Sequence, residues 1–537
     1  MKTVIIFGAK GMLGSYTKLY FKEQPNVEVI CFDKDNYDVR KITVPNIKRL
    51  FKNLKLQKQQ KNFVINCSGV IPQSVDSTQD TTCNYLKVNT IFPMVLEKLA
   101  KEFYYELIHI STDCVFDGIR TDGFSESDED LDQNIYSVSK SIGELCNSCI
   151  IRTSIIGEEL YNNRNLLEFF KSNKNKIISG YENKIWNGIT CLQLAKILHQ
   201  IVDQNLQWKG IRHVFSKESI SKYELANLIN NVYNLGMTIK KESSGKNTNL
   251  TLKTEYREND LFCIPDLKTQ VEQQKNFFEK RILINLSRCK KIEEPFPYII
   301  FDECLKSDFA KELQTEILSY PDNVWDRYEN PFEKKYTFNK KNKFGKFVSK
   351  LFEFLESEIF LEQVSRHFST NLEIDPFRHY WGIHKYKHGD FLNIHADAGI
   401  HPKNKKKKHL TLGLYLSKDW KEQNNGHLEL WTGQTANIDN AKIFECKKSI
   451  LPIFNRLLLF ECNDTSWHGN PVPVSCPNDE VRIFLTISYL SQDMRFLNKR
   501  ERAFFVPRPH EKWSKETEML RLTRADKYNY NKAYRTS

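Results

Sequence analysis

The sequence has no hydrophobic run close to the ~20 residues that a membrane-spanning helix needs. Its thirteen cysteines are odd in number and scattered along the chain. They therefore do not resemble the framework of a small disulfide-rich secreted domain, and we interpret them as reduced thiols. A first strand is predicted over Thr3–Phe7, which leaves no room for a signal peptide before it. We expect a cytoplasmic protein without a membrane segment.

The chain is 537 residues long, which is too long for one hydrophobic core and predicts two or three domains. Hydrophobic residues at 40% and aromatic residues at 12% are typical of globular proteins. The net charge of +12 would suit an anionic substrate or nucleic acid. Surplus surface lysine is the interpretation that we prefer.

The first half of the chain alternates apolar strands with helix-like segments. Strands are predicted over Val27–Phe32, Phe63–Asn66 and Leu107–Ile110. This alternation predicts βαβ units and a doubly wound parallel sheet of the Rossmann type, with a small second lobe. The polar stretch Lys240–Asn249 is predicted as a loop, and Asp266–Lys280 as a helix.

The second half begins near Glu294 and is rich in short strands separated by turn residues. This pattern predicts a β-sandwich or a jelly roll, and of the two we prefer the jelly roll, a double-stranded β-helix. We therefore expect an α/β domain over 1–280, a linker over 281–293, a mainly β domain over 294–495 and a basic tail over 496–537. The predicted strands of the second half are Ile299–Phe301, Tyr380–Tyr386, Leu410–Leu416, His427–Trp431, Arg456–Phe460 and Val481–Tyr489.

A glycine motif follows the first strand. Gly8, Gly11 and Gly14 have the spacing GxxGxxG and lead into a predicted helix. Such a turn lets the backbone approach a pyrophosphate, which then lies on the helix N-terminus. Asp33 ends the second strand, where a carboxylate suits the ribose 2′-hydroxyl of NAD; the adjacent Lys34 leaves NADP open.

A tyrosine and a lysine share one face of another predicted helix. Tyr136 and Lys140 are four residues apart, about one helical turn. A nearby ammonium lowers the pKa of a phenol, so the pair suits acid–base chemistry. Thr112 follows the strand Leu107–Ile110, at the carboxyl edge where doubly wound sheets bind ligands.

With these motifs, the first half resembles the extended short-chain dehydrogenases/reductases, and among them the dTDP-4-dehydrorhamnose reductases. The resemblance implies reduction of a 4-keto-6-deoxy nucleotide sugar by NADPH or NADH. It implies that Thr112 polarises the sugar carbonyl, Tyr136 donates the proton, Lys140 holds Tyr136 and the nicotinamide ribose, and Asp113 lies near the sugar. The stretches that carry the resemblance are Gly8–Gly14, Asn66–Gly69, Val88–Thr90, Ser111–Gly118, Tyr136–Lys140 and Arg152–Ser154.

The same resemblance implies a set of cofactor-binding residues besides Tyr136 and Lys140. We also consider a homodimer that forms through this half of the chain. The sequence departs from the family at Ile155–Ile156, where an aromatic residue is usual. The implied cofactor-binding residues are Gly8, Lys10, Gly11, Met12, Leu13, Gly14, Asp33, Asp38, Cys67, Ser68 and Asn89.

The second half contains a pattern of metal ligands. His395 and Asp397 lie two residues apart in a strand-like segment and so point to one face; His468 follows 73 residues after His395. Two imidazoles and one carboxylate form the facial triad that leaves iron three open positions. Arg482 follows on an apolar strand, where a buried guanidinium would need an anionic partner such as the C5 carboxylate of 2-oxoglutarate.

These residues make the second half resemble the prolyl 4-hydroxylase-like Fe(II)/2-oxoglutarate oxygenases. The resemblance implies that His395, Asp397 and His468 bind Fe(2+) and that Arg482 with Tyr386 holds 2-oxoglutarate. It implies hydroxylation of a C–H bond in an unidentified substrate, with ascorbate as an optional reductant. The matching stretches are Pro295–Pro297, Tyr386–Asp397, Gly426–Trp431 and Trp467–Gly469, together with Arg482.

The leading hypothesis is a bifunctional enzyme of sugar metabolism, and two alternatives stay open. Only one half could be catalytic, with the other a binding or scaffolding module, or the oxygenase could hydroxylate a protein unrelated to the sugar pathway. The lysine run 403–408 is interpreted as a solvated loop, or else as a lip that attracts an anionic substrate. For the basic tail, a helix packed on the second domain is preferred over nucleic-acid binding.

Overall fold

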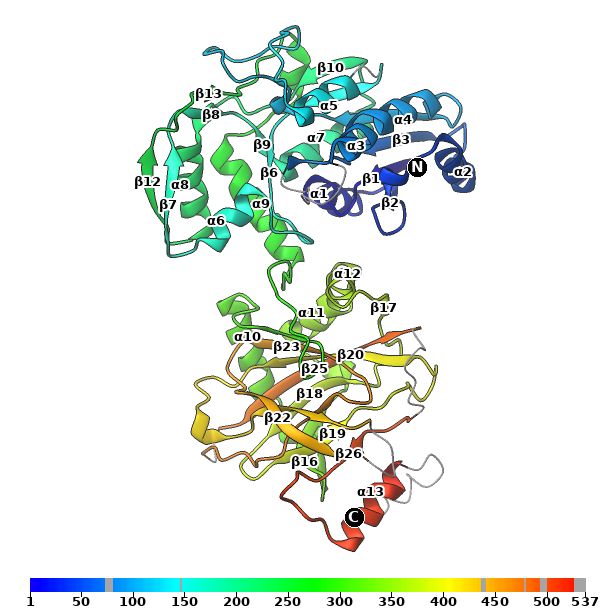
Figure 1. The fold of residues 1–537 in the computed structure, drawn as a ribbon, viewed down its shortest axis with the longest axis vertical. Helices are drawn as coiled ribbons and strands as arrows, with labels where there is room; N and C mark the ends of the chain where they lie inside the picture. The colour runs from blue at the N-terminus through cyan, green and yellow to red at the C-terminus, as the bar shows by residue number, and fades with distance from the viewer. Residues whose placement is uncertain (73–80, 145–146, 436–440, 478–479, 493–499, 526–537) are drawn as a thin grey trace. The chain divides into compact units, whose positions relative to one another are not determined.

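The computed structural model describes residues 1–72, 81–144, 147–435, 441–477, 480–492 and 500–525. The chain divides into two compact units, Met1–Arg281 and Ile282–Ser537. Each unit is described separately below, and both are drawn in Figure 1. In the described part of the chain, no helix combines the length and the apolar character that crossing a bilayer requires.

The first unit is built on a parallel sheet of six strands in the order β10-β5-β4-β3-β1-β2 (Figure 1). Helices α2 and α4 pack on one face through Phe51, Phe92 and Leu96, while Val4 and Ile6 of the opposite face are also fully buried. Burial on both faces is what a doubly wound sheet requires. The strands are β1 Lys2–Phe7, β2 Val27–Phe32, β3 Lys61–Asn66, β4 Tyr105–Ile110, β5 Cys149–Arg152 and β10 Gly210–His213.

The helices that accompany this sheet include a π-helical turn that joins α3 to α4. Helices α1 and α7 pack against each other, and α5 packs against the π-helical turn. The bounds are α1 Met12–Phe21, α2 Val44–Leu54, α3 Thr81–Tyr85, the π-helix η3 Leu86–Ile91, α4 Phe92–Ala100, α5 Ile135–Gly143 and α7 Cys191–Gln204, with short 3-10 turns η1 Val39–Lys41, η4 Asp113–Val115 and η5 Arg257–Phe262.

A smaller lobe follows β5 and has its own core around Trp186, Leu225 and Val271. The predicted loop Lys240–Asn249 was wrong in part, because Thr238–Glu242 forms β12, which pairs with β7. Its elements are β6 Ile155–Ile156, α6 Leu166–Ser172, β7 Ile177–Tyr181, β8 Lys184–Trp186, β9 Ile189–Thr190, β11 Ile220–Ser221, α8 Lys222–Tyr233, β12 Thr238–Glu242, β13 Thr248–Asn249 and α9 Leu267–Arg281.

The second unit is a curled, mainly antiparallel sheet, in which β16 joins the wall β23-β20-β25-β18 to the wall β19-β24-β21-β22 (Figure 1). This is the jelly-roll arrangement that the sequence predicts. The strands are β14 Tyr298–Phe301, β15 Asp326–Asn330, β16 Glu333–Phe338, β17 Leu372–Glu373, β18 Trp381–Tyr386, β19 Phe391–Ala396, β20 Lys407–Tyr415, β21 Leu428–Gly433, β22 Ile443–Ile450, β23 Arg456–Glu461, β24 Trp467–Asn470, β25 Arg482–Ser491 and β26 Phe504–Phe505.

The helices of the second unit lie at its two ends in sequence: α10 Ser307–Leu318, α11 Lys346–Leu355, α12 Glu358–His367 and α13 Lys515–Ala525. The segment expected to be a linker, 281–293, is packed rather than loose. Ile284 and Leu286 are buried, and the Leu286 amide donates to the Gln363 side chain of α12 at 2.8 Å.

The C-terminal segment belongs to the jelly roll as far as residue 525. Its strand β26 pairs with β19, and Arg524 of α13 reaches Glu333 of β16 at 2.9 Å. A helix packed on this unit was the preferred expectation for the tail. Residues 526–537, which hold the tail's last three tyrosines, lie outside the described residues.

Candidate functional sites

The first candidate site lies where β1 turns into α1. Gly8 has a φ of 79°, and a Cβ on Gly14 would lie 2.0 Å from the Gly8 carbonyl oxygen. A Cβ on Gly8 would lie 2.9 Å from the carbonyl carbon of Cys67 and from the amide nitrogen of Ser68. Glycine is therefore required for the turn to lie against the end of β3. The N-terminus of α1, which begins after Gly11 with Met12 and Leu13, suits a phosphate.

The acidic residues expected near the adenosine ribose differ in their surroundings. Asp33 lies directly after β2, and Lys10 lies 3.6 Å from its carboxylate and 2.8 Å from that of Asp35. Asp38 instead caps a short helix and accepts hydrogen bonds from the backbone and guanidinium of Arg40. The Asp38 carboxylate is thus committed to Arg40, whereas Asp33 stands next to a lysine of the glycine turn.

Asn89 and Ser68 brace the loop that follows β3. The Asn89 side chain accepts from the Val70 amide at 2.9 Å and donates to the Ser139 hydroxyl of α5 at 3.0 Å. The Ser68 amide donates to the Asn66 side chain at 3.1 Å. Burial raises the pKa of the neighbouring Cys67 to about 12, so this cysteine is a neutral thiol. Asn89 thus links the loop that follows β3 to helix α5.

The predicted acid–base residues converge at the carboxyl edge of the sheet. Lys140 is buried, and its ammonium donates to the carbonyl of Ile110 at the end of β4, at 3.3 Å. Burial raises the pKa of Tyr136, and a hydrogen bond with Thr112 acts in the opposite direction. Burial also lowers the pKa of Lys140 to about 8. The pKa of the Tyr136 phenol is therefore raised rather than lowered, because burial outweighs the hydrogen bond with Thr112.

A cavity of about 130 Å³ in the first unit is lined partly by residues that the sequence did not single out. It is lined by Met12, Ser154, the Ile155–Ile156 strand, Trp186 and Lys222, among others. The ammonium of Lys222 lies 4.8 Å from the centre of the Trp186 ring. Burial raises the pKa of Asp113, while the Lys222 charge and a Ser154 hydrogen bond oppose this. Asp113 and Lys222 therefore belong to the same polar region.

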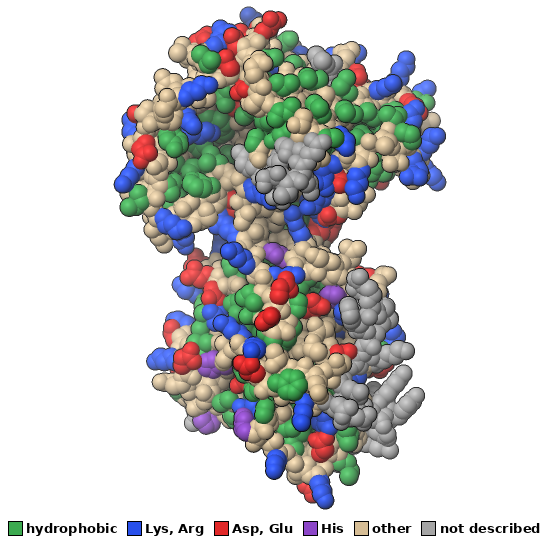
Figure 2. All heavy atoms as spheres, in the orientation of Figure 1, with side chains coloured by type: hydrophobic (Ala, Val, Ile, Leu, Met, Phe, Trp, Pro, Cys, Tyr) green, Lys and Arg blue, Asp and Glu red, His purple; other side chains and the backbone are tan. Residues whose placement is uncertain are grey.

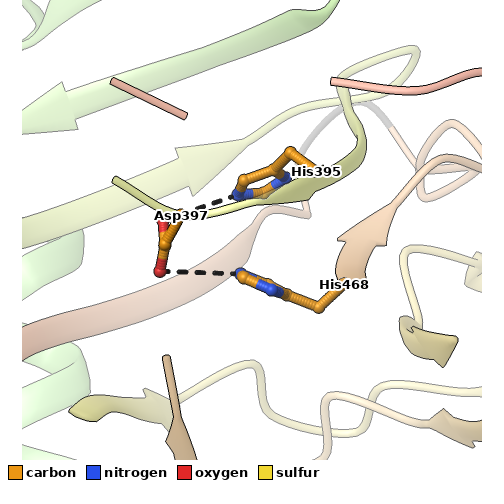
Figure 3. A group of neighbouring side chains, drawn as sticks. All are labelled: His395, Asp397 and His468. Atoms are coloured by element: carbon orange, nitrogen blue, oxygen red, sulfur yellow. Dashed lines mark ion pairs between the residues drawn. The ribbon is translucent and has the colours of Figure 1, made fainter. Parts of the chain in front are cut away.

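The second candidate site is a compact group of three side chains in the jelly roll (Figure 3). His395 of β19 and His468 of β24 are paired directly across the two strands. The Nε2 atoms of His395 and His468 lie 3.8 and 3.9 Å from the carboxylate oxygens of Asp397. One ligand atom from each residue lies within 4.8 Å of the others. This spacing suits three ligands on one metal ion.

The protonation states of this group also suit a metal. The Nδ1 atoms of His395 and His468 each lie 2.9 Å from a backbone carbonyl, which leaves Nε2 directed at Asp397. Burial lowers the pKa of both imidazoles, that of His395 to about 3. Burial would raise the pKa of Asp397, but the adjacent charge of Lys408 holds it far below its usual range. Two neutral imidazoles and one carboxylate are the donors that ferrous iron binds.

The end of the lysine run is buried, which corrects the expectation of a solvated loop. Lys407 and Lys408 are 4% and 5% exposed and begin β20. The Lys408 ammonium lies 2.6 Å from Asp397 Oδ2. Lysine patterns in sequence could not show this, because the run reads as hydrophilic whichever residues turn inward.

Arg482 lies in the same cavity of about 300 Å³ as the three ligands. It is 2% exposed and pairs across the strands with Tyr386, whose ring centre lies 4.7 Å from the guanidinium carbon. Its Nε and Nη1 have no hydrogen-bond partner among the described residues. A buried guanidinium without a partner is costly, so a carboxylate ligand is the natural occupant. Four alternate residues of β25 line the cavity: Arg482, Phe484, Thr486 and Ser488.

A dinucleotide-type α/β unit joined to a jelly roll with a His-Asp-His group defines an enzyme of the oxidoreductase class with two different domains. Residues 1–249 match the family model of the RmlD substrate binding domain, and residues 381–489 match that of the 2OG-Fe(II) oxygenase superfamily. The chain thus carries an N-terminal RmlD substrate-binding domain and a C-terminal 2OG-Fe(II) oxygenase domain, as the two resemblances implied.

Similar proteins are found for the first unit. The chain is 28% identical over 239 residues to a dTDP-4-dehydrorhamnose reductase of Aggregatibacter actinomycetemcomitans, a match covering 42% of this chain and 77% of the relative. Among solved structures, the reductase of Clostridium acetobutylicum is 22% identical with a TM-score of 0.44, covering 52% of this chain and all of its own. The Bacillus anthracis reductase, solved with NADP, has the same identity and TM-score and covers 51% and 99%.

The buried Lys140 predicts a rise in stability with pH. The pKa of Lys140 is about 8 in the folded protein without cofactor and about 10.4 in an unfolded chain. Between these values the unfolded chain binds more protons, so stability increases with pH. The free energy of unfolding of the wild type, relative to Lys140→Met, should rise by about 3 kcal/mol from pH 8 to above pH 10. Urea unfolding over this range checks it, and a flat difference would contradict the burial of a charged lysine.

The Lys408–Asp397 pair predicts a specific response to metal. Lys408→Met leaves a buried carboxylate without its cation, which should destabilise the metal-free protein by about 3–5 kcal/mol. Mn(II) or Fe(II) supplies the missing charge, so the metal-induced rise in melting temperature should be larger than in the wild type. In the double variant Lys408→Met with Asp397→Asn, most of the destabilisation should disappear. An equal loss in the double variant would show that Lys408 acts through packing alone.

Proposed function

We propose that the chain is a bifunctional enzyme. Its first unit reduces a 4-keto-6-deoxy nucleotide sugar with NADPH or NADH, and its second unit hydroxylates a C–H bond of a second substrate with Fe(2+) and 2-oxoglutarate. The main support is that each unit holds a complete set of reactive side chains. Thr112, Tyr136 and Lys140 meet at one sheet edge, and the His-Asp-His group shares a cavity with Arg482.

In the reductase unit, the residues of the chain bind the carbonyl and deliver the proton. The reduced nicotinamide supplies the hydride when bound. Thr112 and the Tyr136 hydroxyl would hold the sugar's keto oxygen, and Tyr136 would give up its proton as that oxygen gains charge. Lys140, one turn along α5, would bind the nicotinamide ribose and stabilise the resulting phenolate. Asp113 and Lys222 would contact the sugar or its diphosphate.

Cofactor choice depends on the surroundings of Asp33. Its carboxylate favours the free 2′-hydroxyl of NADH, but Lys10 offsets its charge, and Lys34 follows directly. We propose that both cofactors bind, with the 2′-phosphate of NADPH received by Lys10. The solved Bacillus anthracis reductase contains NADP.

In the oxygenase unit, His395, Asp397 and His468 would hold Fe(2+), with Arg482 and Tyr386 holding the distal carboxylate of 2-oxoglutarate. The bound iron and co-substrate together activate dioxygen. The chain itself would direct three ligand atoms to one point and present the Arg482 guanidinium to the distal carboxylate of 2-oxoglutarate. Ascorbate would serve as an accessory reductant.

Three further parts of the proposal concern assembly and setting. Ile91, Met94, Ile135 and Ile142 are 38–44% exposed, and Figure 2 shows hydrophobic side chains gathered over the region of α3, α4 and α5. This surface supports a homodimer through the reductase unit. We also propose a cytoplasmic location and no nucleic-acid partner. The cysteines that the structure describes are all free thiols.

Two alternatives remain to be separated by experiment: a single active unit, and an oxygenase that acts on a protein. Mass spectrometry of nucleotide sugars incubated with the full chain would test them, with NADPH in one arm and with iron and 2-oxoglutarate in the other. A mass gain of two hydrogens in the first arm and of one oxygen in the second supports the bifunctional sugar enzyme.

Replacing the proton donor gives a direct test of the reductase. Tyr136→Phe should remove most NAD(P)H-dependent reduction of the keto sugar, a loss on the order of 100-fold or more, because general acid catalysis is lost. Cofactor binding, followed by fluorescence, should persist because the glycine turn is unchanged. Reduction at the parent rate would refute the assignment of Tyr136.

Two variants separate metal loss from co-substrate loss in the oxygenase. Asp397→Ala should abolish stoichiometric Fe(II) binding or leave a weak two-histidine site. Arg482→Ala should keep iron but weaken 2-oxoglutarate binding by about 2–5 kcal/mol, because a buried charged contact is lost. The measurements are iron content and the visible absorption band of the anaerobic iron and 2-oxoglutarate complex. Tight iron and a normal band in Asp397→Ala would disprove the ligand assignment.

A further inference from the structure

A second lysine, largely enclosed, lines the oxygenase cavity and was not part of any motif. Lys335 lies on β16, before the residues that match the oxygenase family. Its side chain is 12% exposed and lines the cavity that holds the His-Asp-His group and Arg482. Its ammonium lies 2.9 Å from the Glu333 carboxylate.

Strand register places Lys335 in one row with Arg482. Tyr336 of β16 pairs with Lys385 of β18, so Lys335 and Tyr386 follow as neighbours facing the cavity. Tyr386 pairs in turn with Arg482 of β25. Because adjacent strands are about 4.8 Å apart, the backbones of Lys335 and Arg482 are separated by about 10 Å. The side chains of Lys335 and Arg482 are long enough for both to reach one carboxylate bound between them.

The charges around Lys335 leave a net positive charge on the cavity wall formed by Lys335, Tyr386 and Arg482. Glu333 is buried and receives two cations: Lys335 on one oxygen and Arg524 of α13 on the other, each at 2.9 Å. One carboxylate therefore balances two positive charges, while Arg482 has two N–H positions without a partner among the described residues. The pKa of His384, two residues before Tyr386 on β18, is held well below its usual value by burial and by the Lys335 charge. A buried surplus of positive charge favours an anionic ligand.

We propose that Lys335 is a second cationic anchor for the distal carboxylate of the 2-oxo acid, opposite Arg482, and that helix α13 holds it in place through Glu333. This inference rests on the proposed oxygenase function. Arg524 is a positioning residue: it occupies one Glu333 oxygen, so that the other orients Lys335 toward the cavity. The C-terminal segment, which lies beyond the family match, thereby becomes part of the co-substrate site.

The test is a titration of the full-length Fe(II) protein with 2-oxoglutarate under anaerobic conditions, followed by the visible absorption band. Calorimetry with the Mn(II) protein gives a second measure of binding. Lys335→Met should raise the Kd for 2-oxoglutarate by about 10- to 100-fold, the loss of one charge-assisted hydrogen bond, with iron affinity unchanged. Lys335→Arg should restore most of the affinity.

Lys334→Met is the matched control. Lys334 is the preceding residue of the same strand, points away from the cavity and pairs with Glu329 at 3.1 Å on the surface. It should leave the Kd unchanged. Arg524→Met should raise the Kd for 2-oxoglutarate by a smaller factor, and Arg524→Lys should recover it. A purely structural role for Arg524 would instead lower thermal stability without changing the Kd.

The outcomes are separable. A wild-type protein without a 2-oxoglutarate-dependent band would overturn the proposed oxygenase function itself. A normal wild-type band together with equal Kd values for Lys335→Met and Lys334→Met would overturn only the role of Lys335. If Lys335→Met does not fold, the paired change Glu333→Gln with Lys335→Gln removes one charge of each sign. It should show the same loss of affinity, and an unchanged Kd would reject the anchor.

Discussion

Ionised groups that are largely enclosed in the jelly-roll unit need partners of opposite charge, and this constraint shapes the cavity. Asp397 is paired with Lys408 and lies beside two neutral imidazoles, while Glu333 is paired with Lys335 and Arg524. These contacts bring together four strands and the C-terminal helix. Arg482 differs, because part of its guanidinium has no partner among the described residues. The cavity therefore offers one position to a cation and one to an anion.

The first unit also pairs buried charges, here in an ion pair. Arg152, at the end of β5, forms a buried pair with Glu144 at 2.7 Å, and Glu144 follows directly after α5. This pair fixes the helix that carries Tyr136 and Lys140 against the sheet. Lys140 is itself buried with its ammonium on a backbone carbonyl. The helix of the proposed acid–base residues is thus held by buried polar contacts.

Much of the fold could be predicted because apolar residues recur in the sequence with the periods of strands and helices. The strand Val27–Phe32 has the predicted bounds, and the helix of Tyr136 and Lys140 is observed as α5. The pattern failed for β12, whose residues are almost all exposed or half-buried and carry no alternation. That strand exists because β7 offers it hydrogen bonds, which is a contact between segments far apart in the chain.

The sequence alone was enough to recognise the family of each half, because glycine turns, YxxxK helices and HxD motifs need particular residue types at fixed spacings. Strand spacing predicted that His395 and Asp397 point to one site; β19 ends at Ala396, and Asp397 directly after it still points toward His395 and His468. Only the tertiary structure decided which of many lysines turn inward. Lys335 and Lys408 resemble surface lysines in sequence. Lys408 is buried because Asp397 lies opposite it on another segment. Lys335 pairs with Glu333 of its own strand, and this carboxylate is held from the other side by Arg524 of α13, which is distant in the chain. The free-energy cost of burying a charge depends on the oppositely charged group beside it, and tertiary structure determines which groups come together.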